Sequence, residues 1–270
     1  MRDIEPALQD LTMLAWNERA TSSGTAGTYL KARTGTGRDM IYYKLSRFNG
    51  IEIDGHECVN EIVAGRLMDI LGIPHLTYRL IHANVNLDGK AFETWLNASR
   101  TFRKPGERKQ ALGTFFDLHR LPDETPFSFC ARQGWRDQIA QMMLVDYLIA
   151  NRDRHASNIE VLVSRTGGIR LAPIFDNGLS LVAPLAGLDD LIDAFDPLKP
   201  VATMNFIGSR SLEENLEAIA PVPGLGVLHE TDRAHVLGGL QGIIPDRYLD
   251  KIWDIIWQRW QHYEDIRDHR

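Results

Sequence analysis

Cysteine is scarce in this chain of 270 residues. Cys58 and Cys130 are its two cysteines, and neither lies in a C-x-x-C pattern. Two cysteines cannot build the disulfide framework of a small secreted domain, so a reducing compartment is the simplest setting. Long apolar runs are also lacking, since the stretch 138–150 is too short to span a bilayer and contains Asp146. We therefore expect a soluble, cytoplasmic protein that does not interact with a membrane.

Other absences narrow the class of protein further. There is no G-x-x-x-x-G-K-[ST] string, which excludes a P-loop enzyme, and the nine histidines show no metal-ligand spacing. The first ten residues, MRDIEPALQD, contain no apolar segment typical of a signal peptide. Lysine and arginine number 30 against 36 acidic residues, a net charge of −6. This balance gives no global reason to expect direct contact with nucleic acid.

The order of predicted elements indicates two lobes. Hydrophobic periodicity predicts a short helix over 4–16, strands over 29–32 and 40–45, a helix over 56–71, and strands over 75–85 and 90–98. Beyond that point it predicts a helix over 135–150, a short hairpin over 159–171 and a helix over 246–266. We expect an α+β fold with a small β-rich N-lobe (1–100), a larger, mainly helical C-lobe (101–270) and a cleft between them.

Polar residues with a chemical signature follow the helix at 135–150. Asp153 and Asn158 lie five residues apart in a polar loop, and Asp176 follows an apolar segment and precedes Gly178. Phosphoryl transfer needs one carboxylate to orient the attacking hydroxyl, and a carboxylate and an amide oxygen to hold Mg²⁺ against a triphosphate. We therefore interpret Asp153 as the catalytic aspartate and Asn158 and Asp176 as metal ligands.

The strings Asp153-Arg154-His155-Ala156-Ser157-Asn158 and Phe175-Asp176-Asn177-Gly178 resemble the catalytic core of HipA-like serine/threonine kinases. The D-R-H-x-x-N string is also similar to that of phosphatidylinositol 3-kinase relatives. The resemblance extends upstream to Ser23–Gly27 as a phosphate loop, to Lys44 as the ATP lysine and to Glu61 as its helix glutamate. It implies a two-lobed protein-kinase-like fold, ATP and Mg²⁺ as cofactors, and transfer of the γ-phosphoryl group to a protein serine or threonine.

The same resemblance assigns the remaining candidate residues. Backbone N–H groups around Ser22, Ser23, Gly24, Thr25, Ala26 and Gly27 would hold the phosphates, and the adenine would lie near Leu96, Asn97 and Ala98. Ser22 and Ser23 are candidate autophosphorylation sites that would silence the enzyme. The resemblance also allows a toxin or effector role and an antitoxin-like partner.

Each candidate also has a structural interpretation. Lys44 and Glu61 could be solvated surface charges, and His155 is a better candidate for ordering the loop than for carrying a proton. Asp146 lies within an apolar helix, so it needs a partner and is expected to brace the catalytic loop. Two alternatives for function stay open, a lipid or small-molecule kinase and a nucleotide-binding pseudokinase that acts as an interaction module.

Overall fold

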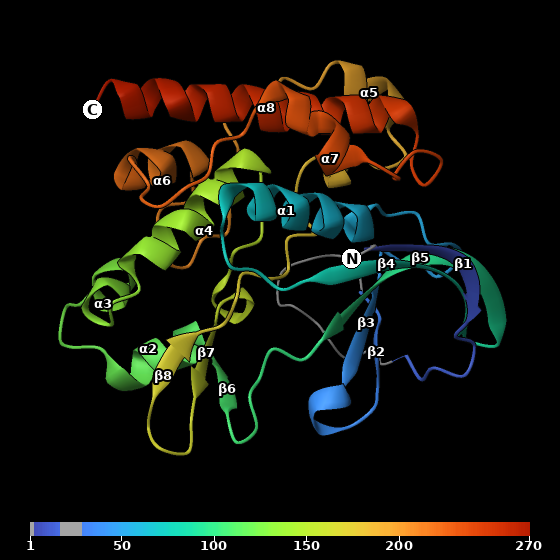
Figure 1. Cartoon of the computed structure of the whole chain (residues 1–270), viewed down its shortest axis with the longest axis horizontal. Coiled ribbons are helices and arrows are strands. Elements are labelled where there is room, and N and C mark those ends of the chain that lie inside the picture. The colour runs from blue at the N-terminus through green and yellow to red at the C-terminus, as the bar shows by residue number, and fades with distance from the viewer. Residues whose placement is uncertain (1–2, 17–28) are drawn as a thin grey trace.

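The computed structural model describes residues 3–16 and 29–270. The first part forms a five-stranded sheet in the order β1-β4-β5-β3-β2 (Figure 1). Its strands are β1 (Ile4–Asp10), β2 (Lys31–Thr34), β3 (Ile41–Leu45), β4 (Tyr78–Leu87) and β5 (Lys90–Arg100). The pairs β2–β3, β3–β5 and β4–β5 are antiparallel, and β1 runs parallel to β4. The predicted strands are confirmed, with the Asp88-Gly89 turn between β4 and β5.

The predicted N-terminal helix over 4–16 is wrong. Residues Ile4–Asp10 form strand β1 at the edge of the sheet, where Ile4 pairs with Leu80 and Gln9 with Ala83. Proline is disfavoured within a helix and tolerated on an edge strand, and Pro6 lies within this edge strand. Pairing with a distant strand therefore outweighed the helical spacing of the apolar residues.

One long helix connects the sheet to the rest of the molecule. Helix α1 (Glu57–Leu71) ends at Gly72, whose left-handed backbone (φ 70°) lets its N–H bond the Asp69 and Met68 carbonyls. Figure 1 shows α1 between the five-stranded sheet and the C-terminal helices. Nearly all of its residues are buried, including the charged Glu57 and Glu61. The helix therefore places side chains at the junction of the two parts.

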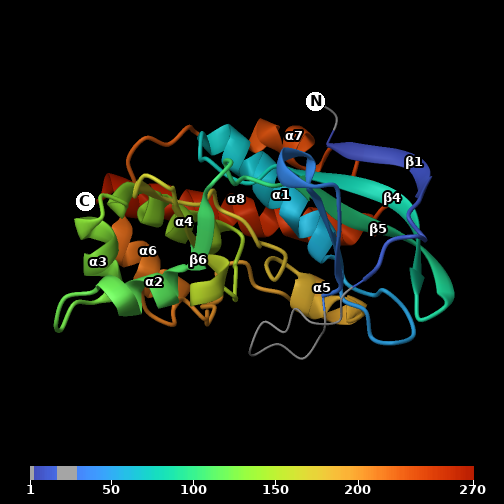
Figure 2. The same cartoon turned by 90° about the horizontal axis from the view of Figure 1, so that it is seen from below.

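The second part is mainly helical, as predicted. Strands β6 (Arg108–Ala111), β7 (Glu160–Val163) and β8 (Ile169–Leu171) form a small antiparallel sheet. The helices are α2 (Leu112–His119), α3 (Pro126–Arg132), α4 (Arg136–Leu148), α5 (Asp189–Asp193), α6 (Leu212–Ile219), α7 (Arg233–Leu237) and α8 (Asp246–Asp268). Figure 2 shows the five-stranded sheet at one end of the molecule and α3 and α6 at the other. Within the described residues, no helix is both long and apolar enough to cross a membrane.

Two hydrophobic cores stabilise the sheet-rich part and the helical part of the molecule. The smaller core packs one face of the five-stranded sheet and includes Leu45, Leu96 and Ala98. The larger core contains α1, α4 and the aromatic stripe of α8, with Trp253 and Trp260 buried. Because α1 belongs to this larger core, the apolar packing crosses the predicted boundary near residue 100. The two parts are therefore held at the junction by shared burial of apolar surface.

Candidate active site

Two adjoining cavities lie where the five-stranded sheet meets the small sheet. The first, of about 230 Å³, is lined by β3, β5 and residues 101–103 that follow β5, and we call it the linker pocket. The second, of about 270 Å³, is lined by the loop that holds Asp153 and Asn158, and we call it the catalytic-loop pocket. Lys44 and Asp176 line both cavities. The predicted catalytic and metal residues therefore converge on one site.

Lys44 lies at the centre of this site. Its Nζ is 3.5 Å from Glu61 Oε1 and forms a second ion pair with Asp176 Oδ1. Lys44 is on strand β3, Glu61 on helix α1, and Asp176 follows the small sheet. The predicted pairing of Lys44 with Glu61 is present. Neither side chain is a solvated surface charge, since the Glu61 side chain is fully buried and that of Lys44 is 16 % exposed.

The charges of this cluster set the protonation states. Burial by itself raises the pKa of Asp176, but the positive charges of Lys44 and Lys31 outweigh it and hold that pKa well below its ordinary value. Burial lowers the pKa of Lys44, yet the carboxylates of Asp176 and Glu61 raise it overall. At neutral pH the site therefore contains an ionised carboxylate and a charged ammonium group, as binding of a metal and a phosphate requires.

The catalytic loop places Asp153, His155 and Asn158 on one wall. Burial raises the pKa of Asp153, the charge of His155 lowers it, and Asp176 raises it further. Asn158 Nδ2 donates to the Asp153 carbonyl at 2.8 Å, so its Oδ1 is the atom it can offer to a cation. His155 Nδ1 accepts from the Ser157 N–H at 3.2 Å, and its Nε2 lies 3.7 Å from Asp153 Oδ1. His155 thus orders the loop, as predicted.

A buried network ties this loop to the loop of Asp176. Arg154 is fully buried; its Nη2 donates to Asp146 Oδ1 and to Asn177 Oδ1, both at 2.7 Å, and its Nη1 to the Phe175 carbonyl at 2.7 Å. The backbone N–H of Asn177 donates to Glu61 Oε2 at 2.9 Å. Asp146 therefore braces the catalytic loop, as predicted, and Asn177 connects that loop to helix α1.

Two of the three residues predicted to lie near the adenine do not line the linker pocket. Leu96 and Ala98 do not line the linker pocket, because they belong to the hydrophobic core on the opposite face of the sheet. Asn97 does line it, since successive residues of a strand point to opposite faces. The proposed phosphate loop and autophosphorylation sites, Ser22, Ser23, Gly24, Thr25, Ala26 and Gly27, lie outside the described residues.

The residues at the site that were not predicted include Lys31, Glu160 and Asn177. Lys31 is directly opposite Lys44 in the β2–β3 ladder and lines both cavities. Glu160 on β7 also lines both cavities. Asn177 is buried between Arg154 and Glu61. The pairing of two lysines across a predicted hairpin is a signal that would have found Lys31. Glu160 and Asn177 carry no comparable signal, because their partners are distant in the sequence.

The residues present fit a magnesium-bound triphosphate. Asp176 and Asn158 supply the hard oxygen atoms that Mg²⁺ prefers, and Lys44 and Lys31 supply positive charge. Among the residues that the structure describes, no group of three or more His, Cys, Asp or Glu side chains is placed to hold a metal. A magnesium ion here would therefore take its other ligands from phosphate and water, which is its usual mode in kinases.

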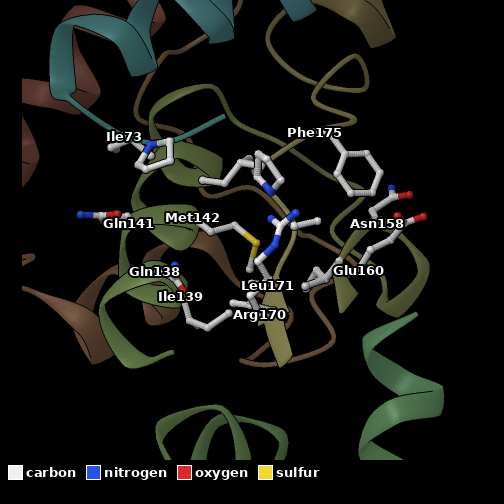
Figure 3. Close-up of a pocket in the computed structure, with 15 residues that line it drawn as sticks. Ile73, Gln138, Ile139, Gln141, Met142, Asn158, Glu160, Arg170, Leu171 and Phe175 are labelled. Carbon is white, nitrogen blue, oxygen red and sulfur yellow. The ribbon is translucent and has the colours of Figure 1, made fainter. Parts of the chain in front are cut away.

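A further cavity lies behind the catalytic loop (Figure 3). It has a volume of about 230 Å³ and is lined by α4, β8 and the segment Ile73–Pro74. Figure 3 shows Asn158, Glu160 and Phe175 together on one side of it, away from Gln138 and Gln141. These three residues also line the catalytic-loop pocket, so the two cavities share a wall.

The fold is kinase-like, and comparison with solved structures agrees. The chain is similar over 96 % of both lengths to the proinflammatory kinase CtkA of Helicobacter pylori, with a TM-score of 0.62 at 14 % identity. It is similar over 90 % of its length to HipA of Shewanella oneidensis MR-1, described in complex with HipB and operator DNA, with a TM-score of 0.50 at 15 % identity. It spans 66 % of that HipA chain.

The sequence itself matches no protein-family model and no curated protein. At these identities the structural likeness shows the fold alone. The predicted two-lobed, kinase-like α+β fold is confirmed, and the predicted resemblance to HipA-like kinases holds at the level of the fold. The similarity of the D-R-H-x-x-N string to phosphatidylinositol 3-kinase relatives stays a prediction.

Proposed function

We propose that this protein is an ATP- and Mg²⁺-dependent kinase that transfers the γ-phosphoryl group to a serine or threonine of a protein. The observation that carries the proposal is the convergence of Lys44, Glu61, Asp153, Asn158 and Asp176 on one site. Lys44 and Glu61 are separated from the other three residues by more than ninety residues of sequence. A structural role alone does not need an ionised carboxylate, a half-buried ammonium group and an amide oxygen along one pocket wall.

Each residue has a role in the proposed reaction. Lys44 binds the phosphates, and Glu61, 3.5 Å from its Nζ, holds the lysine in place. Asp176 and Asn158 hold Mg²⁺, which neutralises charge on the phosphates when bound. Asp153 orients the acceptor hydroxyl and takes its proton as that oxygen attacks the γ-phosphorus. The bond from that phosphorus to the bridging oxygen breaks, and ADP leaves.

The acceptor class separates this proposal from its first alternative. The segment 183–200, which follows Asp176 in the sequence, includes Asp190, Asp193 and Asp196, which are exposed, and Lys199 is its one cation. The negative charge of this segment disfavours binding of an anionic lipid headgroup by like-charge repulsion. A protein acceptor, with the antitoxin-like partner as a further hypothesis, agrees better with this charge.

Incorporation of labelled phosphate from γ-labelled ATP tests the proposal. The full chain is incubated with Mg²⁺ and ATP, and label is measured on the chain itself, on a bacterial protein extract and on phosphoinositide vesicles. Asp153→Asn should lower transfer by about 10²–10⁴-fold while leaving ATP affinity within about twofold. The exposed Asp117→Asn is the matched control.

Each result decides between the alternatives. Label on protein that requires Asp153 supports the proposal, and label on vesicles alone supports a lipid kinase. ATP binding without transfer to any acceptor would identify a pseudokinase. Transfer that is equal in the Asp153→Asn variant and in the wild-type protein would show that Asp153 has another role.

A further inference from the structure

Asn97 has an unusual environment in the wall of the linker pocket. It lies on β5, directly opposite Lys44 on β3 and Leu80 on β4, and it is 1 % exposed. Neither its Nδ2 nor its Oδ1 has a hydrogen-bond partner. Among the described residues it is the one amide side chain whose donor and acceptor atoms are both buried and unpartnered. Burying an unpartnered amide costs free energy, so this residue needs an explanation.

The rest of the linker pocket is suited to a flat ring. Phe102 and Phe175 lie on its wall with ring centroids 5.8 Å apart, and Tyr42 lines the pocket from β3. Aromatic faces pack favourably against a planar base. The Lys44 ammonium group lies at the boundary with the catalytic-loop pocket. A nucleotide with its base in the linker pocket would therefore point its phosphates toward Lys44 and Asp176.

We propose that the Asn97 amide reads the base of the nucleotide and selects adenine over guanine. This inference rests on the proposed function. An asparagine amide presents one donor beside one acceptor, which matches the N7 acceptor and 6-amino donor of adenine in a bidentate pair. Guanine presents two acceptors on the same edge, O6 and N7, so Oδ1 would face an acceptor and stay unpaired. The apolar core on the opposite face takes no part, since Leu96 and Ala98 point away.

Calorimetric titration of the full chain with Mg²⁺ and three nucleotides tests the inference. The probes are ATP, GTP and 7-deaza-ATP, which keeps the 6-amino group and lacks N7. The wild-type protein should bind ATP about 5- to 150-fold more tightly than GTP or 7-deaza-ATP. In Asn97→Leu, which keeps the side-chain size, the three affinities should differ by less than about threefold. Asn84→Leu on the neighbouring strand β4, outside the pocket, should keep the wild-type ratios.

The outcomes separate this inference from the proposed function. Equal binding of all three nucleotides by the wild-type protein overturns the inference alone, as does an Asn97→Leu variant that keeps the wild-type ratios. Absence of binding by all three overturns the proposed function and the inference with it. If Asn97→Leu does not fold, the ratio of ATP to 7-deaza-ATP on the unchanged protein still decides, since it needs no variant.

Discussion

Replacing Asp146 with asparagine should break the buried connection between the two loops of the site. Asp146 and Arg154 are both fully buried, and the Asp146 carboxylate accepts hydrogen bonds from Arg154 Nε and Nη2 and from Asn151 Nδ2. Asparagine keeps the shape but removes the negative charge and turns one acceptor into a donor. Arg154 is left as a buried cation whose remaining partners are neutral.

The magnitude follows from that burial. Removing one partner of a buried ion pair costs about 3–5 kcal/mol. For a chain of this size, a loss of 1 kcal/mol lowers the melting temperature by about 2 °C, so we expect a decrease of roughly 6–10 °C. Asp137→Asn is the matched control, because Asp137 is exposed on the same helix α4. It should lose at most about 1 kcal/mol through the helix dipole.

Unfolding in urea, followed by circular dichroism, measures the change in free energy. A second variant, Asp146→Leu with Arg154→Met, removes both charges and should regain part of the lost stability. It should not regain activity, because Arg154 also holds the Phe175 carbonyl and Asn177. If Asp146→Asn unfolds within about 0.5 kcal/mol of the wild-type protein, the network does not hold the two loops as described.

Three further predictions concern the same site. The pKa of Asp153 is raised, so the acid limb of the pH profile of kcat/KM should have its midpoint above 3.8, the ordinary pKa of an aspartate. His155→Gln should move that midpoint still higher, because the charge of His155 lowers the pKa of Asp153. A midpoint at or below pH 3.8 would contradict the assignment of Asp153 as the catalytic base. Lys31 lies opposite Lys44, so Lys31→Met should remove a phosphate contact and weaken ATP binding about tenfold or more. Calorimetry should show that the affinity for adenosine, which has no phosphate, is unchanged. Equal effects on the two ligands would exclude a contact between Lys31 and the phosphates. Gly178→Ala should cost about 1–3 kcal/mol in thermal unfolding, since its Cβ would lie 2.9 Å from Glu57 Cβ. Gly65→Ala is its control, because that Cβ meets only His75 at 3.5 Å, and it should not destabilise.

The sequence by itself determined the local chemistry of the site. The five-residue spacing of Asp153 and Asn158, and the position of Asp176 before a glycine, depend on short segments with their own turn and strand signals. Helix α1 and the β4–β5 hairpin were predictable for the same reason, because periodicity and the Asp88-Gly89 turn act over a few residues.

Only the tertiary structure decided which distant groups meet. Strand β1 exists because it pairs with β4, more than seventy residues away, and this pairing outweighs the local helical spacing. Asn177 binds Glu61 across 116 residues, and nothing local shows that contact. The unpartnered amide of Asn97 is likewise a property of the assembled sheet and pocket. A strand residue shows its face in the sequence pattern, but its neighbours across that face are chosen by the packing of the whole chain.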